Sequence, residues 1–138
     1  MTDPREVGAS EILTTAMNMV REARETVLVT MQAAEELAHP LPRDYFLLLE
    51  QKMHEGVQLI RIGFGSKEEF AHLQDQTQFS HSNYRFYPTE STDYRRMLLV
   101  DNKKMLFAKT DADGRHVFYT EDPRLIADLK TYAQTFSV

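Results

Sequence analysis

The feature that most constrains the fold is a strand–helix–strand succession in the first half of the chain. The segment Thr26–Met31 is short, apolar and rich in β-branched residues, as a buried strand is. Helical spacing of apolar residues follows over Arg43–Glu55, and Gly56 stands where a glycine commonly ends a helix. The apolar run Val57–Phe64 predicts a second strand. Two strands joined through a helix predict a parallel βαβ unit, and therefore an α/β domain.

The remainder of the chain predicts antiparallel strands and a closing helix. Asp101-Asn102 and Asp111–Gly114 are turn signals between apolar segments, so we expect hairpins there. Asp122-Pro123 predicts the start of a last helix. At the other end of the chain, Asp3–Glu6 has the form of a helix start, with an acidic cap, a proline and a glutamate three residues after the cap. We therefore expect an α/β fold with a mixed sheet flanked by helices.

Composition indicates a single globular domain. The 138 residues are enough for one sizeable core and contain no repeats or low-complexity tracts, so we expect residues 1–138 to form one domain. The absence of cysteine excludes disulfides, thiolate metal sites and cysteine nucleophiles. No apolar run approaches the ~18 residues of a membrane span, and the first residues lack the pattern of a secretory signal. We expect a cytoplasmic protein without a transmembrane segment.

The net charge of −5 weighs against nucleic acid as a partner, because binding to a polyanion normally needs a basic face. The sequence nevertheless contains one local cluster of cations, which consists of Arg95, Arg96, Lys103 and Lys104. Such a cluster could bind a small anion. We therefore expect the partner to be a small anionic ligand or a protein, and not nucleic acid.

The sequence predicts neither a metal site nor a cofactor. The five histidines form no His-x-His or His-Glu-x-x-His pair, so they lack the spacing of a zinc site. The segment Asp111–Gly114 begins like a calcium loop, but Arg115 stands at the fifth position and the flanking helices are missing. The segment Gly63–Ser66 could bind an anion through backbone amides, but it serves equally well as an ordinary turn between a strand and a helix.

The segment Tyr94–Asn102 has the spacing of a known motif. It resembles the His-x-Lys-x-x-x-x-Asp motif of the phospholipase D-like superfamily, and the step Gly56–Arg61 is similar to that family's entry into its second strand. The resemblance extends over residues 8–136 and implies a phospholipase D-like half-domain with an α/β fold. Two such halves pack side by side in the family, so the resemblance also implies a homodimer with both motifs at one cleft.

The departures from the motif bear on function. Tyr94 stands where the family has the histidine that forms a phospho-histidine, Arg96 stands in place of the phosphate-binding lysine, and Asp101 is retained. A phenol with an ordinary pKa near 10 is a poor nucleophile at neutral pH. Arginine keeps the positive charge and offers a fork of donors suited to phosphate or carboxylate. The resemblance therefore implies an anion site without covalent chemistry, in which Arg96 contacts the anion, Tyr94 lines the pocket and Asp101 orients Arg96.

Three functions remain open from the sequence. The one we favour is a non-catalytic binding or sensor module with a regulatory output, as degenerate domains of this type are in archaeal sugar-responsive transcription regulators and in midbody proteins. The second is a phosphodiesterase with a substituted active site, and the third is a purely structural dimerisation or interaction domain. Ordinary structural explanations also exist for the site residues. Tyr94 and Arg96 alternate on an expected strand and so share one face, and Asp101 stands at a turn, where aspartate is common.

Overall fold

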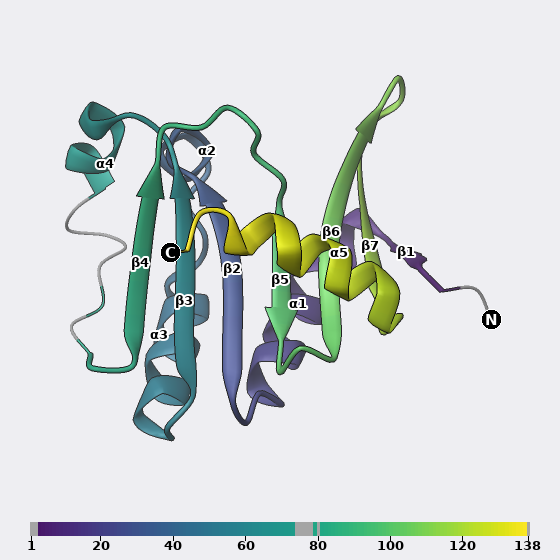
Figure 1. Cartoon of the computed structure of the whole chain (residues 1–138), viewed down its shortest axis with the longest axis horizontal. Helices are drawn as coiled ribbons and strands as arrows, with labels where there is room; N and C mark the ends of the chain where they lie inside the picture. The colour runs from purple at the N-terminus through teal and green to yellow at the C-terminus, as the bar shows by residue number, and fades with distance from the viewer. Residues whose placement is uncertain (1–2, 74–78, 80, 138) are drawn as a thin grey trace.

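The structure, a computed structural model, describes residues 3–73, 79 and 81–137, and within them a seven-stranded mixed sheet forms the centre of the molecule (Figure 1). The strands are β1 (Arg5–Val7), β2 (Thr26–Gln32), β3 (Gln58–Phe64), β4 (Tyr84–Thr89), β5 (Met97–Val100), β6 (Lys104–Asp111) and β7 (Gly114–Thr120). Their order in the sheet is β1-β7-β6-β5-β2-β3-β4. β2, β3 and β4 are parallel to one another, whereas β5 pairs antiparallel with β2 and the strands beyond it continue antiparallel.

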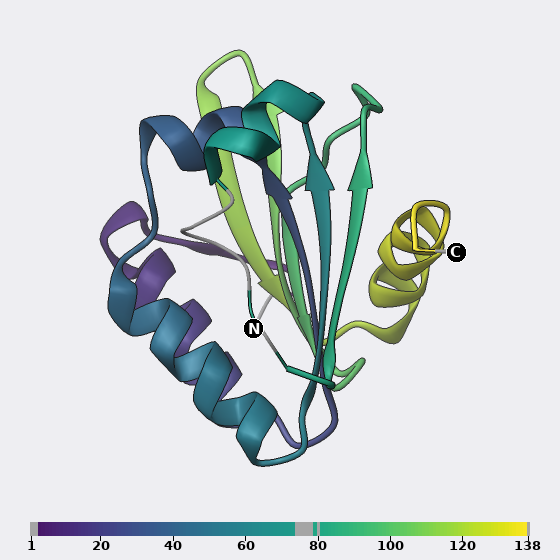
Figure 2. The ribbon, with the colours of Figure 1, turned by 90° about the vertical axis from the view of Figure 1, so that its left-hand side faces the viewer.

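Helices cover both faces of this sheet (Figure 2). They are the 3-10 helix η1 (Ala9–Glu11) and the α-helices α1 (Ile12–Arg21), α2 (Ala33–Ala38), α3 (Arg43–His54), α4 (Lys67–Leu73) and α5 (Pro123–Gln134). α1 and α3 lie on one face and α5 lies on the other, while α2 and α4 contact each other near the carboxyl ends of the parallel strands. The predicted fold class, an α/β mixed sheet flanked by helices, is confirmed. Within the described residues, no helix is long and apolar enough to cross a membrane.

The two larger of the three hydrophobic clusters among the described residues form the cores on the two faces of the sheet, because side chains alternate across it. On β5, Leu98 packs with residues of α1 and α3, whereas Leu99 packs with residues of α5. All four residues of β5 are buried, since helices cover both faces at the middle of the sheet. The sheet therefore forms one wall of each core, and the same strands contribute side chains to both cores.

Local sequence signals set several ends of these elements. Gly56 follows α3 with a φ of +101°, a conformation that glycine adopts without steric cost. The Asp122 carboxylate accepts a hydrogen bond from the backbone N–H of Arg124 at 3.0 Å and caps α5. Asp101 and Asn102 both have positive φ values at the β5–β6 turn, as the turn prediction requires.

The predicted helix start at Asp3–Glu6 is wrong. Residues Arg5–Val7 instead form the edge strand β1, which pairs antiparallel with β7, and α1 begins only at Ile12. The Asp3 carboxylate accepts hydrogen bonds from the Thr120 hydroxyl and from the backbone N–H of Glu121. The local pattern favoured a helix, but pairing with β7 satisfies the backbone groups of both segments, and sequence-local reasoning does not reveal that distant edge.

Candidate ligand-binding site

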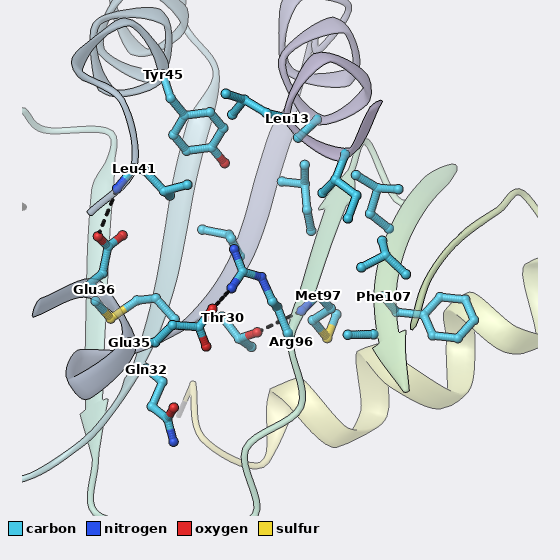
Figure 3. A pocket seen from close by; sticks show the side chains of 18 of the residues that line it. Leu13, Thr30, Gln32, Glu35, Glu36, Leu41, Tyr45, Arg96, Met97 and Phe107 are labelled. Carbon is cyan, nitrogen blue, oxygen red and sulfur yellow. Dashed lines mark hydrogen bonds and ion pairs between the residues drawn. The ribbon is translucent and has the colours of Figure 1, made fainter. Parts of the chain in front are cut away.

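A cavity of about 260 Å³ lies between the sheet and the helices α1, α2 and α3 (Figure 3). Its apolar walls include Ile12 and Leu13 of α1 and Val117 of β7. Its charged end is formed by Glu35 of α2 and by Arg96, which immediately precedes β5. The cavity is thus a largely apolar space with charged side chains at one end.

Arg96 points its guanidinium into this cavity (Figure 3). Its Nη1 donates to Glu35 Oε1, and Arg115 of β7 donates to both oxygens of the same carboxylate at 3.1 and 3.2 Å. The Arg96 side chain is 37 % exposed and that of Glu35 is 22 % exposed. Burial, and then the nearby charge of Arg115, lower the pKa of Arg96, but a guanidinium remains protonated in proteins. Two cations share one carboxylate here, so this group of three side chains is net positive.

Tyr94 lines the same cavity, although its ring belongs to the core beneath α5. The ring lies 5.2 Å from the ring of Phe64, measured between centroids. Burial raises the pKa of Tyr94 to about 12, against the opposing charge of Arg115. Because β5 begins at Met97, Tyr94 and Arg96 precede the strand, and the predicted alternation on a strand face does not apply to them. Tyr94 is therefore an uncharged part of the wall at neutral pH.

Asp101 lies at the opposite end of β5 from Arg96. The predicted contact of Asp101 with Arg96 is absent between these two described residues. The Asp101 carboxylate instead accepts hydrogen bonds from the backbone N–H groups of residues 24–26 at 2.8 to 3.3 Å. Partial burial alone would raise the pKa of Asp101, but these N–H groups and Lys103 bring the pKa below its ordinary value. Glu35, and not Asp101, is the residue that orients Arg96.

The cations that the sequence grouped together are separated in space; they are Arg95, Arg96, Lys103 and Lys104. The first two precede β5 and the other two lie at its far end, next to the turn into β6. Arg95 turns toward the opposite face, where its guanidinium lies 4.5 Å from the ring centre of Tyr132 on α5. Lys104 pairs with Glu22 at 2.7 Å. Among these four residues, Arg96 alone lines the cavity.

Sequence reasoning missed the acidic and basic residues that complete the cavity. Glu36 is buried and accepts a hydrogen bond from the backbone N–H of Leu41 at 3.4 Å. Burial raises the pKa of Glu36, while the Leu41 hydrogen bond and the charge of Arg61 oppose this shift. Arg61 is itself buried on β3 and lies 5.9 Å from the ring centre of Phe46. An arginine inside an apolar strand was a usable signal, because a buried cation needs partners.

The other two segments considered from the sequence have structural roles. Asp111 and Gly114 pair at the β6–β7 turn, and the Asp111 carboxylate accepts a hydrogen bond from the backbone N–H of Asp113 at 2.8 Å. The backbone N–H of Ser66 donates to the Glu69 carboxylate at 2.8 Å, which caps α4. Among the described residues, no group of three or more His, Asp or Glu side chains has an arrangement that could hold a metal ion.

Two of the solved structures that share this fold are TrmBL2 and NucT. TrmBL2, an archaeal chromatin protein whose structure shows a novel mode of DNA binding, matches with a TM-score of 0.74 and 15 % identity, over 99 % of this chain and 51 % of that one. NucT from Helicobacter pylori, which has a phospholipase D-like fold, matches with a TM-score of 0.64 and 13 % identity, over 92 % of this chain and 87 % of that one. This chain therefore spans about half the length of TrmBL2. No family model matches the sequence, and no curated protein matches it in sequence.

These matches support the fold and correct one prediction. At such identities they show the fold alone, and the NucT match supports the phospholipase D-like architecture that the motif implied. The prediction that set nucleic acid aside is wrong, because the fold of this chain also occurs in a protein that binds DNA. Net charge is a sum over the whole surface, whereas binding to nucleic acid depends on the electrostatic field at the contact surface and on any other protein chains that take part. A net charge of −5 therefore does not exclude nucleic acid as a partner. The chain is similar in fold to a DNA-binding chromatin protein and to a phospholipase D-like protein.

Proposed function

We propose that this chain is a non-catalytic binding or sensor module of a regulatory protein, and that its ligand is a small anion held by Arg96. One observation carries the proposal: a half-buried guanidinium points into a cavity with several of its donors unused. Nη1 of Arg96 donates to Glu35, and the other N–H groups of the Arg96 guanidinium have no hydrogen-bond partner among the described residues. A planar fork of this kind binds carboxylate or phosphate oxygens, often through two parallel hydrogen bonds.

The charge balance within the group Arg96, Arg115 and Glu35 supports an anion. Arg96 and Arg115 together carry two positive charges, and Glu35 carries one negative charge. A bound monoanion would neutralise the excess. Glu35 holds both guanidinium groups in place before the ligand arrives, so less side-chain entropy is lost on binding.

The proposal treats Tyr94 as wall and not as nucleophile. With a pKa of about 12, roughly one Tyr94 side chain in 100,000 is a phenolate at pH 7. Incubation with bis-p-nitrophenyl phosphate at neutral pH should therefore give no turnover. Turnover that disappears in Tyr94→Phe would instead establish the phosphodiesterase alternative.

Binding is tested with phosphate, sulfate, acetate and sugar phosphates by thermal shift and calorimetry. At least one of these anions should raise the melting temperature, since a ligand that binds the folded state stabilises it. Arg96→Gln should remove the response. Arg95→Gln is the matched control, because it makes the same change of charge one residue away, where the guanidinium lies over Tyr132. A full response in Arg96→Gln would contradict the proposal and favour a purely structural interaction domain.

A second candidate function, contact with nucleic acid, is favoured by the match to TrmBL2. Fluorescence anisotropy with a short labelled DNA duplex tests it. Contacts to phosphates predict an affinity that falls steeply between about 50 and 200 mM salt. The homodimer remains part of the proposal on the strength of the resemblance, and sedimentation velocity tests it. The cytoplasmic location remains part of the proposal because the sequence has no cysteine and no pattern of a secretory signal.

A further inference from the structure

We infer that the ligand of this cavity is an amphipathic monoanion, a small organic carboxylate whose head group binds Arg96 and whose apolar tail fills the space beneath α1. This inference rests on the proposed anion site at Arg96 and adds the chemistry of the rest of the molecule. It follows from the uneven distribution of polar groups around the cavity.

The carboxylates of the cavity lie to one side of Arg96. In Figure 3, Glu35 and Glu36 lie on one side of the guanidinium, and Leu13 lies on the other side, toward α1. The wall on the Leu13 side is built from aliphatic side chains of α1, β6 and β7, among them Ile12, Ala108 and Val117. A ligand that extends in this direction meets mainly carbon atoms, with the Tyr45 hydroxyl as a polar group nearby, whereas a sugar would leave most of its hydroxyl groups without partners there, at a cost in affinity.

The same distribution argues for a single negative charge. A second carboxylate placed toward α2 would approach Glu36, which is buried among the residues that line the cavity. A second carboxylate placed toward α1 would be buried among aliphatic side chains. The α1 side offers no cation among the described lining residues, and on the α2 side the charge of Arg61 already acts on Glu36. One anionic head group on Arg96 is therefore the arrangement that the described side chains accommodate.

The volume fits a short tail. The cavity holds about 260 Å³, just below the ~300–1,000 Å³ of most ligand pockets. That space corresponds to roughly nine water volumes of ~30 Å³ each, and water in an apolar cavity lacks hydrogen-bond partners. A medium-chain carboxylate such as octanoate therefore replaces poorly bound water with buried methylene groups.

Calorimetric titration of the full chain with three probes tests the inference: octanoate, acetate and 1-octanol. Octanoate should bind at least about 100-fold more tightly than acetate, because each buried methylene group multiplies affinity about fourfold. It should also bind at least about tenfold more tightly than 1-octanol, which has the tail without the charge.

Two kinds of variant separate head from tail. Arg96→Gln should lower the affinity for octanoate at least about tenfold and leave the affinity for 1-octanol unchanged. Arg95→Gln should leave the affinity for octanoate unchanged. Ala108→Phe fills the apolar side and should reduce octanoate to the affinity of acetate. If circular dichroism shows Ala108→Phe to be unfolded, Leu13→Asn serves instead, because Leu13 is already 37 % exposed.

The outcomes distinguish this inference from the proposed function. Equal affinities for octanoate and acetate, both lost in Arg96→Gln, would overturn the amphipathic ligand and keep the anion site. Equal affinities for octanoate and 1-octanol would overturn the role of Arg96 in both the proposed anion site and the amphipathic ligand. No binding of octanoate, acetate, phosphate, sulfate or the sugar phosphates would overturn the anion site and this inference together.

Discussion

At the scale of single residues, Arg96 and Asp101 have separate roles although one motif joins them in the sequence. The four residues of β5 lie between them, and a strand rises about 3.3 Å per residue, which places the two residues about 16 Å apart along the chain. Arg96 faces the cavity, whereas Asp101 ties the β5–β6 turn to the segment that enters β2. The spacing of a motif predicts which residues are used, but not that they meet.

Asp101→Ala should therefore weaken folding and leave ligand binding intact. The substitution removes the acceptor of backbone N–H groups from residues 24–26, and we expect a loss of about 1–2 kcal/mol in the free energy of unfolding. Asp101→Asn keeps one acceptor oxygen and should lose less. Urea denaturation measures the stability, and calorimetry with octanoate checks that affinity is unchanged. A lower ligand affinity in folded Asp101→Ala would show that Asp101 contributes to ligand binding.

Because of the Asp101 carboxyl, we also expect the stability of the fold to depend on pH in the acidic range. Its pKa is lowered in the folded state, so its stabilising effect is present above its ordinary pKa, near 3.8, and is lost as the pH falls through the lowered value. Wild type and Asp101→Asn should accordingly converge in stability in that acidic range.

At the scale of elements, the sequence predicted the inner strands well and the edge poorly. β2, β3 and β5 are apolar runs that need two covered faces, so their composition alone indicates buried strands. β1 has three residues and depends on β7, which lies more than a hundred residues further along the chain. Glu35 was missed for the same reason, since its partners Arg96 and Arg115 come from distant segments.

The docking of β1 should depend on pH through His116. His116 Nδ1 lies 3.0 Å from Glu6 Oε2 on β1, and its Nε2 lies 3.3 Å from Asp111 Oδ1 without hydrogen-bond alignment. The hydrogen bond with Glu6, and then the charge of Asp111, raise the pKa of His116 above its ordinary value. The folded state therefore favours the protonated ring, and this stabilisation is complete below pH 6.5 and is lost as the pH rises through the raised pKa.

His116→Gln should consequently melt at a lower temperature than wild type near pH 5.5, and the difference should shrink toward about pH 8.5. Differential scanning calorimetry at both values measures it. His81→Gln is a control for a histidine remote from β1, since His81 precedes the turn into β4. A difference between wild type and His116→Gln that grows with pH would contradict the proposed pairing.

At the scale of the whole molecule, the shared sheet implies that the two cores unfold together. Leu98 and Leu99 are neighbours in β5, yet the first is 5 % exposed in the core of α1 and α3 and the second is 1 % exposed in the core of α5. Truncating either leaves a cavity, and we expect Leu98→Ala and Leu99→Ala each to lose about 2–5 kcal/mol. Because one strand forms a wall of both cores, the loss on either face should lower the stability of the entire chain.

Denaturation followed by far-ultraviolet circular dichroism and by tyrosine fluorescence tests this cooperativity. The two signals should have one common midpoint in wild type and should move together in each variant, as for a two-state domain. Tyr45 reports on the core of α1 and α3, and Tyr132 on that of α5, so the fluorescence samples both faces. If Leu99→Ala lost the α5 core in a separate, earlier transition, the prediction of one domain over residues 1–138 would be wrong. α5 would then be a cover that unfolds independently of the sheet.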